Sequence, residues 1–233
     1  MSLLSIVSSF AGRNGIPVPS TVIGNTDTNV IQILRLLEEE GNDLAKRGNW
    51  NVLTREATHT TVATEDQGAI ATIAPTYYRC ILNDTIWDRS GKLPIYVVSD
   101  QDWQAIKAMT VTGAPYRYRL RGGRLLASPT PTAGLTWAFE YISAAWILNG
   151  STPVQYFVAD TDTMLLPEDL VLQGLRWRYL REKGLEYAEL FATYEKQVEY
   201  ALSTERTHEK LNAAGYCSRE PGFWLPAMNW ITP

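Results

Sequence analysis

The sequence has little of the material from which most catalytic and metal-binding sites are built. It contains two cysteines, Cys80 and Cys217, and two histidines, His59 and His208. The cysteines are far apart and show no metal-ligand spacing, which predicts reduced thiols and agrees with a cytosolic origin. Neither histidine lies near a Ser, Cys or carboxylate pattern typical of a triad, and a triad with partners distant in the chain remains open.

Gly-rich phosphate loops and common hydrolase signatures are missing as well. The chain has no Walker-type loop, no GxGxxG, no HExxH and no GxSxG. In a chain of 233 residues, these absences favour a protein that is not an enzyme and that binds no cofactor.

The carboxylates form short clusters that have a structural explanation. Asp160 and Asp162 could supply oxygen ligands to a hard cation, and a metal-dependent enzyme at these residues is one alternative. However, two carboxylates just before a predicted helix are typical of loops and helix caps. Glu38, Glu39 and Glu40 are interpreted as the solvated face of a helix.

No stretch of the sequence is apolar for the length of a membrane span. The first residues lack the basic region of a signal peptide, so we expect a protein that is made inside the cell. The formal net charge is -4, which predicts that any contact with DNA is local rather than a general attraction. Apolar residues make up 45% of the chain, with eight Trp and twelve Tyr, so a packed core is expected.

The clearest local signal is a β-hairpin around Gly122 and Gly123. Two consecutive glycines suit a type I′ turn, whose central residues both need φ > 0. The turn fixes the register and predicts the pairs Arg121–Arg124, Leu120–Leu125 and Tyr118–Ala127. One face then carries Tyr116, Tyr118, Leu120 and Leu125, and the other carries Arg117, Arg119, Arg121 and Arg124. The arginine face predicts a carboxylate or phosphate partner, or else a solvated and screened edge.

Apolar periodicity predicts helices at both ends of the chain and short strands between them. The expected helices cover about residues 3–10, 27–48, 101–109, 167–183 and 185–213, and Gly184 is expected to separate the last two. Residues 135–142 alternate as a half-buried strand. The fold class is therefore α+β: an α-helical bundle built from both chain ends, with an inserted antiparallel β barrel or sandwich domain. The expected divisions are 1–48 and 148–214 for the bundle, 49–147 for the β domain, and 215–233 for an extended aromatic arm.

Three stretches together resemble a known family. They are SLLSIVSSFAGRNGIPVPS followed by NVIQILRLLEEEGNDLAKRGNW, then YRYRLRGGRLLASPTPTAGLTWAFEYISAAW, then LLPEDLVLQGLRWRYLREKGLEYAELFATYEKQV. In this order they are similar to the head–tail adaptor proteins of short-tailed bacteriophages, also called tail tubular protein A. The resemblance extends from Leu3 to about Leu202, and its motifs are structural rather than catalytic.

The resemblance implies a structural protein of the virion tail, assembled in the host cytoplasm. Such adaptors form a homo-oligomeric, twelve-fold ring between the portal protein and the tail nozzle protein. Genomic double-stranded DNA passes through the ring without sequence-specific binding. The arginine face would then pair with carboxylates of a neighbouring subunit or of the nozzle, because the planar guanidinium suits such pairs.

Two further expectations concern the binding surfaces. Phe223, Trp224 and Trp230 are predicted interface residues of the arm, which would become ordered on a neighbouring subunit or the portal; the alternative is that it folds back on its own bundle. The rival function is a nucleic-acid- or carbohydrate-binding β module flanked by helices, with the Tyr/Arg hairpin as its platform.

Overall fold

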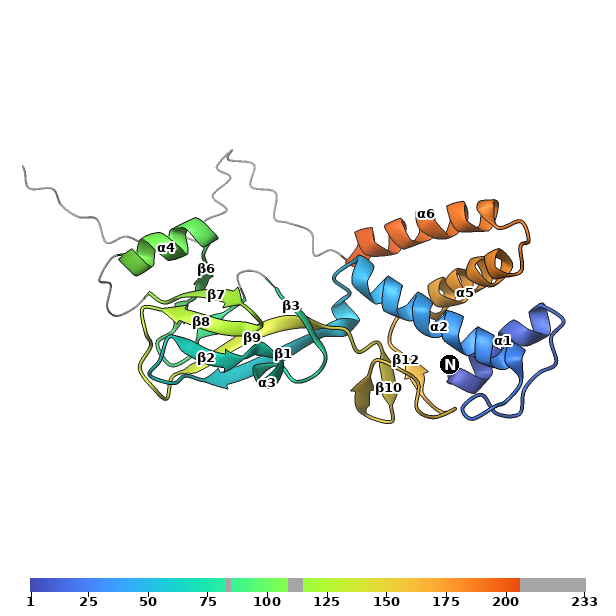
Figure 1. Cartoon of the computed structure of the whole chain (residues 1–233), viewed down its shortest axis with the longest axis horizontal. Coiled ribbons are helices and arrows are strands. Elements are labelled where there is room, and N and C mark those ends of the chain that lie inside the picture. Colours follow the sequence, from blue (N-terminus) through green and yellow to red (C-terminus); the bar gives the residue numbers. More distant parts are fainter. Residues whose placement is uncertain (83–84, 109–114, 206–233) are drawn as a thin grey trace, which may run out of the picture.

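The computed structural model describes residues 1–82, 85–108 and 115–205. These residues form a mixed α+β fold with six α-helices and several sheets. Most of the helices lie beside the larger sheets (Figure 1), and the buried residues form two hydrophobic cores. The predicted arm with Phe223, Trp224 and Trp230 lies outside the described residues, as do His208 and Cys217.

The helices begin and end where the sequence provides capping groups. Asp27 accepts a hydrogen bond from the backbone N–H of Asn29 (2.8 Å) at the start of α2, and Ser99 accepts one from Asp102 (3.1 Å) at the start of α4. Gly184 has a φ of +67° and follows the end of α5, as predicted. The helices are α1 Leu3–Arg13, α2 Thr28–Arg47, α3 Ile70–Ile73, α4 Asp100–Ala108, α5 Glu168–Glu182 and α6 Ala188–Glu205, with a 3₁₀ turn η1 at Asn51–Leu53.

The first core is built by helices from both ends of the described chain. It is formed by α1, α2, α5 and α6, together with residues before, within and after the strands, such as Trp50, Ile142 and Trp146. Its largest fully buried side chains include Trp50, Trp146 and Tyr194. Trp146 lies against Gly41 of α2, where an added Cβ would come within 2.2 Å of the indole ring. Glycine therefore allows the tryptophan to pack directly on the helix backbone.

Short strands make up three sheets. One has the order β1-β9-β4-β5, with β3 also paired to β9; a second has the order β2-β8-β7-β6; the third has the order β11-β10-β12. The bounds are β1 Thr54–Thr60, β2 Asp66–Ala69, β3 Tyr78–Ile81, β4 Trp87–Asp88, β5 Leu93–Pro94, β6 Tyr96–Val97, β7 Arg117–Arg121, β8 Arg124–Ser128, β9 Thr136–Ser143, β10 Ile147–Asn149, β11 Thr152–Val154 and β12 Thr163–Met164. No sheet in this part of the chain closes into a barrel, and β6 pairs with β7 in parallel.

The second core lies between the first two sheets. Tyr118, Leu125 and Ala127 of the β7–β8 hairpin are buried in it. Trp137, Phe139 and Tyr141 of β9 enter it from the other sheet. The hairpin register is the predicted one, with Arg121 opposite Arg124 and Tyr118 opposite Ala127, and both glycines of the turn have positive φ.

Strand β9 is more deeply buried than the alternating pattern predicted. The prediction of a half-buried strand is wrong, because Ala138 and Ile142 on the expected outer face are also buried, and only Glu140 is exposed. Strands β1, β3 and β4 flank β9 on its two edges, and Ile142 joins the helical core. A central strand that contacts two cores needs apolar residues on both faces.

Candidate functional site

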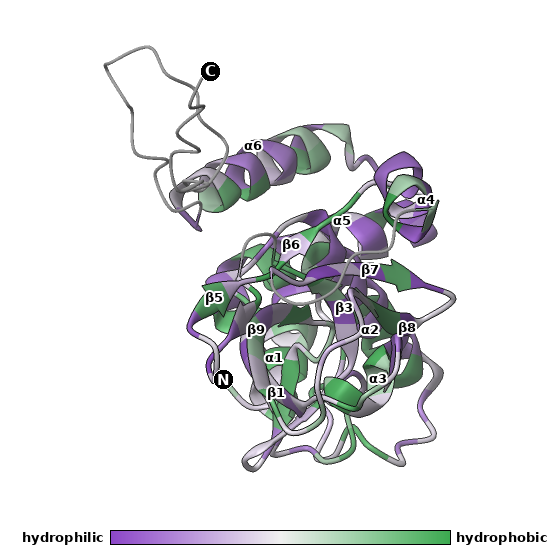
Figure 2. Cartoon of the chain, turned by 90° about the vertical axis from the view of Figure 1, so that its left-hand side faces the viewer, coloured by the Kyte–Doolittle hydropathy of each residue, from purple (hydrophilic) through white to green (hydrophobic). Residues whose placement is uncertain are grey.

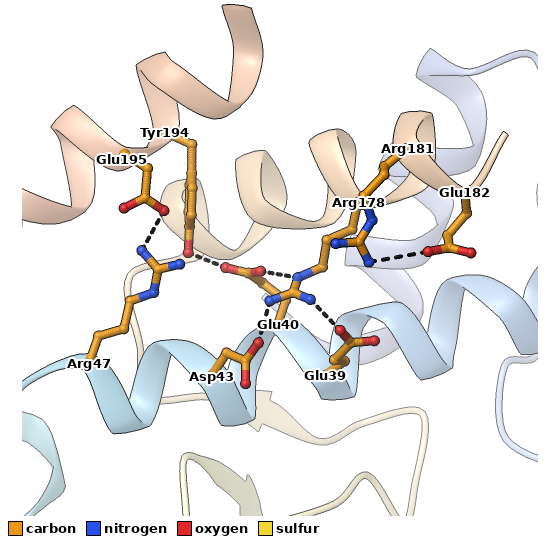
Figure 3. A network of polar contacts seen from close by, with 9 residues as sticks. All are labelled: Glu39, Glu40, Asp43, Arg47, Arg178, Arg181, Glu182, Tyr194 and Glu195. Carbon is orange, nitrogen blue, oxygen red and sulfur yellow. Dashed lines mark hydrogen bonds and ion pairs between the residues drawn. The ribbon is translucent and has the colours of Figure 1, made fainter. Parts of the chain in front are cut away.

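A cluster of buried charged side chains lies between α2, α5 and α6. The prediction that Glu38, Glu39 and Glu40 form a solvated face is wrong. The side chain of Glu40 is 0% exposed and Glu38 is also buried, whereas Glu39 is half exposed. Figure 3 shows that Glu39 and Glu40 extend from α2 toward α5.

Arg178 of α5 supplies the positive charge at the centre of this cluster. Its guanidinium is almost completely buried and forms ion pairs with three carboxylates of α2: Glu39, Glu40 (2.5 Å) and Asp43 (2.5 Å) (Figure 3). Burial lowers the pKa of Arg178, but the hydrogen bond and charge of Glu40 and the other carboxylates outweigh it, and the net pKa is raised. The guanidinium is therefore permanently charged, and its planar fork can bind several oxygens at once.

Tyr194 connects α6 to the same cluster. Its hydroxyl donates a hydrogen bond to Glu40, and its ring is fully buried. Burial and the adjacent Glu40 charge raise the pKa of Tyr194 above its ordinary value. A second pair, Arg47–Glu195 (2.5 Å), lies beside it and also joins α2 to α6.

The backbone of α5 is shaped to accept this arrangement. Gly174 faces Glu40, and an added Cβ would lie 2.1 Å from the Glu40 carboxyl group. The absence of a side chain at Gly174 is what leaves space for a carboxylate between the two helices. The cluster thus joins α2, α5 and α6 through buried polar contacts.

A sequence signal for this cluster existed but was incomplete. The buried stripe of α2 contains Ile33, Leu37 and Leu44, and helical spacing leaves position 40 on the same stripe. That spacing places Glu40 toward the core. Its partner Arg178 lies 138 residues away, so no local pattern could identify the pair.

The hairpin arginines lie on the outer face of their sheet, as expected, but two of them have carboxylate partners within the chain. Arg119 pairs with Asp100 (2.7 Å) at the start of α4, and Arg124 pairs with Asp66 (2.5 Å) of β2. The hydrogen bond from Arg124 lowers the pKa of Asp66. Arg117 lies over the ring of Tyr96, at 5.5 Å from its centroid.

Arg121 differs from the other hairpin arginines. It is exposed next to the turn, and no ion pair or side-chain hydrogen bond is formed by it within the described ranges. Tyr116 and Tyr118, on the opposite face, are buried in the β core. The hairpin therefore exposes cations without exposing the tyrosine rings on which bases or sugars would stack.

The other candidate residues have structural contacts. The Asp160 carboxylate accepts hydrogen bonds from the backbone N–H groups of Val22 and Ile23 (2.7 Å for Ile23), which fixes the loop before α2. The Asp162 carboxylate accepts two backbone hydrogen bonds from its own loop. His59 lies on β1 with its ring 3.4 Å from the side-chain oxygen of Gln67. Within residues 1–82, 85–108 and 115–205, no group of three or more His, Cys, Asp or Glu residues could hold a metal ion.

Comparison with known proteins gives no identification. No model of a known protein family matches the chain, and no curated protein matches it either. Among the described helices, none is both long and apolar enough to cross a membrane.

Proposed function

We propose that this protein is a structural virion protein, a ring-forming head–tail adaptor of a short-tailed bacteriophage. In this role it joins the portal protein to the tail nozzle protein and forms part of the channel for DNA ejection. The proposal rests first on the sequence resemblance. The three stretches that carry it correspond to α1 and α2, to the β7–β8 hairpin with β9, and to α5 and α6.

The observation that most supports this role is how the two cores are assembled. Helices that are far apart in the chain share one core, and the strands between them have their own core. We interpret this arrangement as a helical bundle with an inserted β-sandwich domain, divided at about residues 48 and 147. In such an arrangement, each domain can contact a different component, which is what a connector between two rings requires.

Exposed apolar side chains on α6 also suit a subunit of an assembly. Leu185, Tyr187, Phe191 and Tyr200 are exposed before or along this helix. Figure 2 shows that α6 carries both hydrophobic and hydrophilic bands along its length. Exposed aromatic residues of this kind are common anchors of protein–protein interfaces.

The rival function, a nucleic-acid- or carbohydrate-binding module, receives less support from the hairpin. Its platform was expected to combine arginines with tyrosines, but both tyrosines face the core. Salt-sensitive oligonucleotide binding by a stable monomer would favour this rival.

A deletion phage tests the adaptor role directly. Without this protein, DNA-filled heads should accumulate without tails, and electron micrographs of the purified protein should show rings, alone or on the portal. Normal tail attachment in the deletion phage would refute the proposal.

A further inference from the structure

A groove of about 680 Å³ lies on the outer face of the sheet that contains β1, β9 and β4. Its lining includes Glu56, Thr85, Trp87, Arg89, Lys92 and Glu140. Strand alternation places this face on the opposite side of the sheet from Trp137, Phe139 and Tyr141, which fill the β core. The groove is therefore open to solvent and independent of the buried charge cluster.

Two carboxylates meet in this groove with only one of them neutralised. Glu140 lies directly opposite Glu56 in the β1–β9 ladder, and like charges in opposite positions destabilise a sheet. Arg89 forms an ion pair with Glu56. The Glu140 carboxylate forms no ion pair and no hydrogen bond within the described part of the chain, and Glu140 is the one exposed residue of its strand.

An exposed aromatic ring lies next to this carboxylate. Trp87 pairs with Ala138, two residues before Glu140 on the same strand, so both side chains lie on the outer face. Trp87 is 47% exposed. An indole beside an unpaired carboxylate suits an arginine, because the guanidinium can stack on the ring while its N–H groups donate to the carboxylate.

The chain itself contains a cation of this kind. Arg121 is exposed and unpaired among the described residues, and it lies at the tip of the β7–β8 hairpin. The adjoining turn consists of Gly122 and Gly123, which have no side chains and open space around them. The turn therefore adds no side-chain bulk beside Arg121 when the tip approaches another surface.

The tip and the groove cannot meet within one molecule. They lie on the outer faces of two sheets that enclose the β core between them, so the two outer faces point in opposite directions. A contact between them must join two copies through different surfaces. Such heterologous contacts generate closed rings when the rotation between neighbours closes.

We propose that the Arg121 tip of one copy docks in the Trp87–Glu140 groove of the next copy. This contact rests on the proposed ring and specifies which surfaces form it. Arg121 stacks on Trp87 and pairs with Glu140, which gives Glu140 a counter-ion as Arg89 does for Glu56.

Reversal of charge tests this contact in the full-length protein. Arg121→Glu and Glu140→Lys should each raise the concentration for half-maximal assembly at least about tenfold, measured by sedimentation velocity, because like charges then meet at the contact. The double variant Arg121→Glu/Glu140→Lys restores an opposite-charge pair and should assemble within about threefold of the wild type. Arg176→Glu, the same change at an exposed residue of α5, is the control and should assemble normally.

The outcomes separate this contact from the adaptor role. A wild-type ring whose assembly is unchanged by either single reversal would refute the docking contact and leave the adaptor proposal standing. A wild-type protein that forms no oligomer, alone or with the portal, would overturn both. Loss of oligonucleotide binding by Arg121→Glu with normal assembly would assign the hairpin to nucleic acid instead. All three residues are exposed, so unchanged circular dichroism is expected of every folded variant.

Discussion

Replacing Arg178 with methionine should be among the most damaging single changes to the helical core. The substitution keeps much of the aliphatic volume but removes the charge that faces three carboxylates. Glu39 and Asp43 are each about half exposed (50% and 46%), so water can hydrate them after the loss. Glu40 is fully buried and would keep only the Tyr194 hydroxyl as a partner.

The expected cost therefore comes mainly from Glu40. Breaking a buried ion pair by removing one partner typically costs about 3–5 kcal/mol, because an uncompensated charge stays buried. In a domain of this size, each kcal/mol of lost unfolding free energy lowers the melting temperature by about 2–4 °C. We expect a decrease of roughly 6–20 °C, measured by thermal unfolding followed by circular dichroism.

The matched control lies one turn further along the same helix. Arg181 is exposed, and its guanidinium also lies over the ring of Trp177, at 5.2 Å compared with 4.8 Å for Arg178. Arg181→Met thus loses a similar ring contact but no buried ion pair, and should cost less than about 1 kcal/mol. Adding Glu40→Gln to Arg178→Met should recover part of the loss. Equal destabilisation by the two arginine variants would refute the reasoning.

Two other changes to the helical core have defined consequences. The raised pKa of Tyr194 means that the folded state favours the neutral phenol; this stability is present below about pH 10, the ordinary tyrosine value, and is lost as the pH rises above it. Tyr194→Phe should therefore reduce the free energy of unfolding by about 1.5–3 kcal/mol at neutral pH. Urea unfolding curves should also show a smaller loss of stability at alkaline pH in the variant than in the wild type. An equal loss would assign the pH dependence to other groups. Gly41→Ala should cost about 1–3 kcal/mol in the same assay, since the new methyl group would overlap the fully buried Trp146 ring, and an unaffected midpoint would show that the indole can move aside.

Much of the secondary structure could be predicted because its signals are local. Gly122 and Gly123 fixed the hairpin register, and Asp27 and Ser99 cap their helices through hydrogen bonds to residues two and three positions further on. Each of these residues acts on neighbours within a few positions, so the local sequence alone determines the turn or the start of the helix. Gly184 separated α5 from α6 for the same reason.

What could not be predicted depends on contacts between distant segments. The apolar spacing of α2 places Glu40 toward the core, but its partner Arg178 comes from α5, and no local pattern identifies that pair. The exposed faces of β4 and β9 form a groove through strand pairing that no periodic pattern reveals. The parallel pairing of β6 with β7 likewise depends on a long connection rather than on a turn.

Strand β9 has a mechanical consequence for the whole subunit. Its Tyr141 is buried in the β core, and the next residue, Ile142, is buried in the helical core. Rotation of the helices against the β sheets would twist β9, whose edges are hydrogen-bonded to β1, β3 and β4. Glu140 lies only two residues from Ile142, about 7 Å along the strand. Torque applied to the helices would therefore reach the surface that carries Glu140 through this hydrogen-bonded strand.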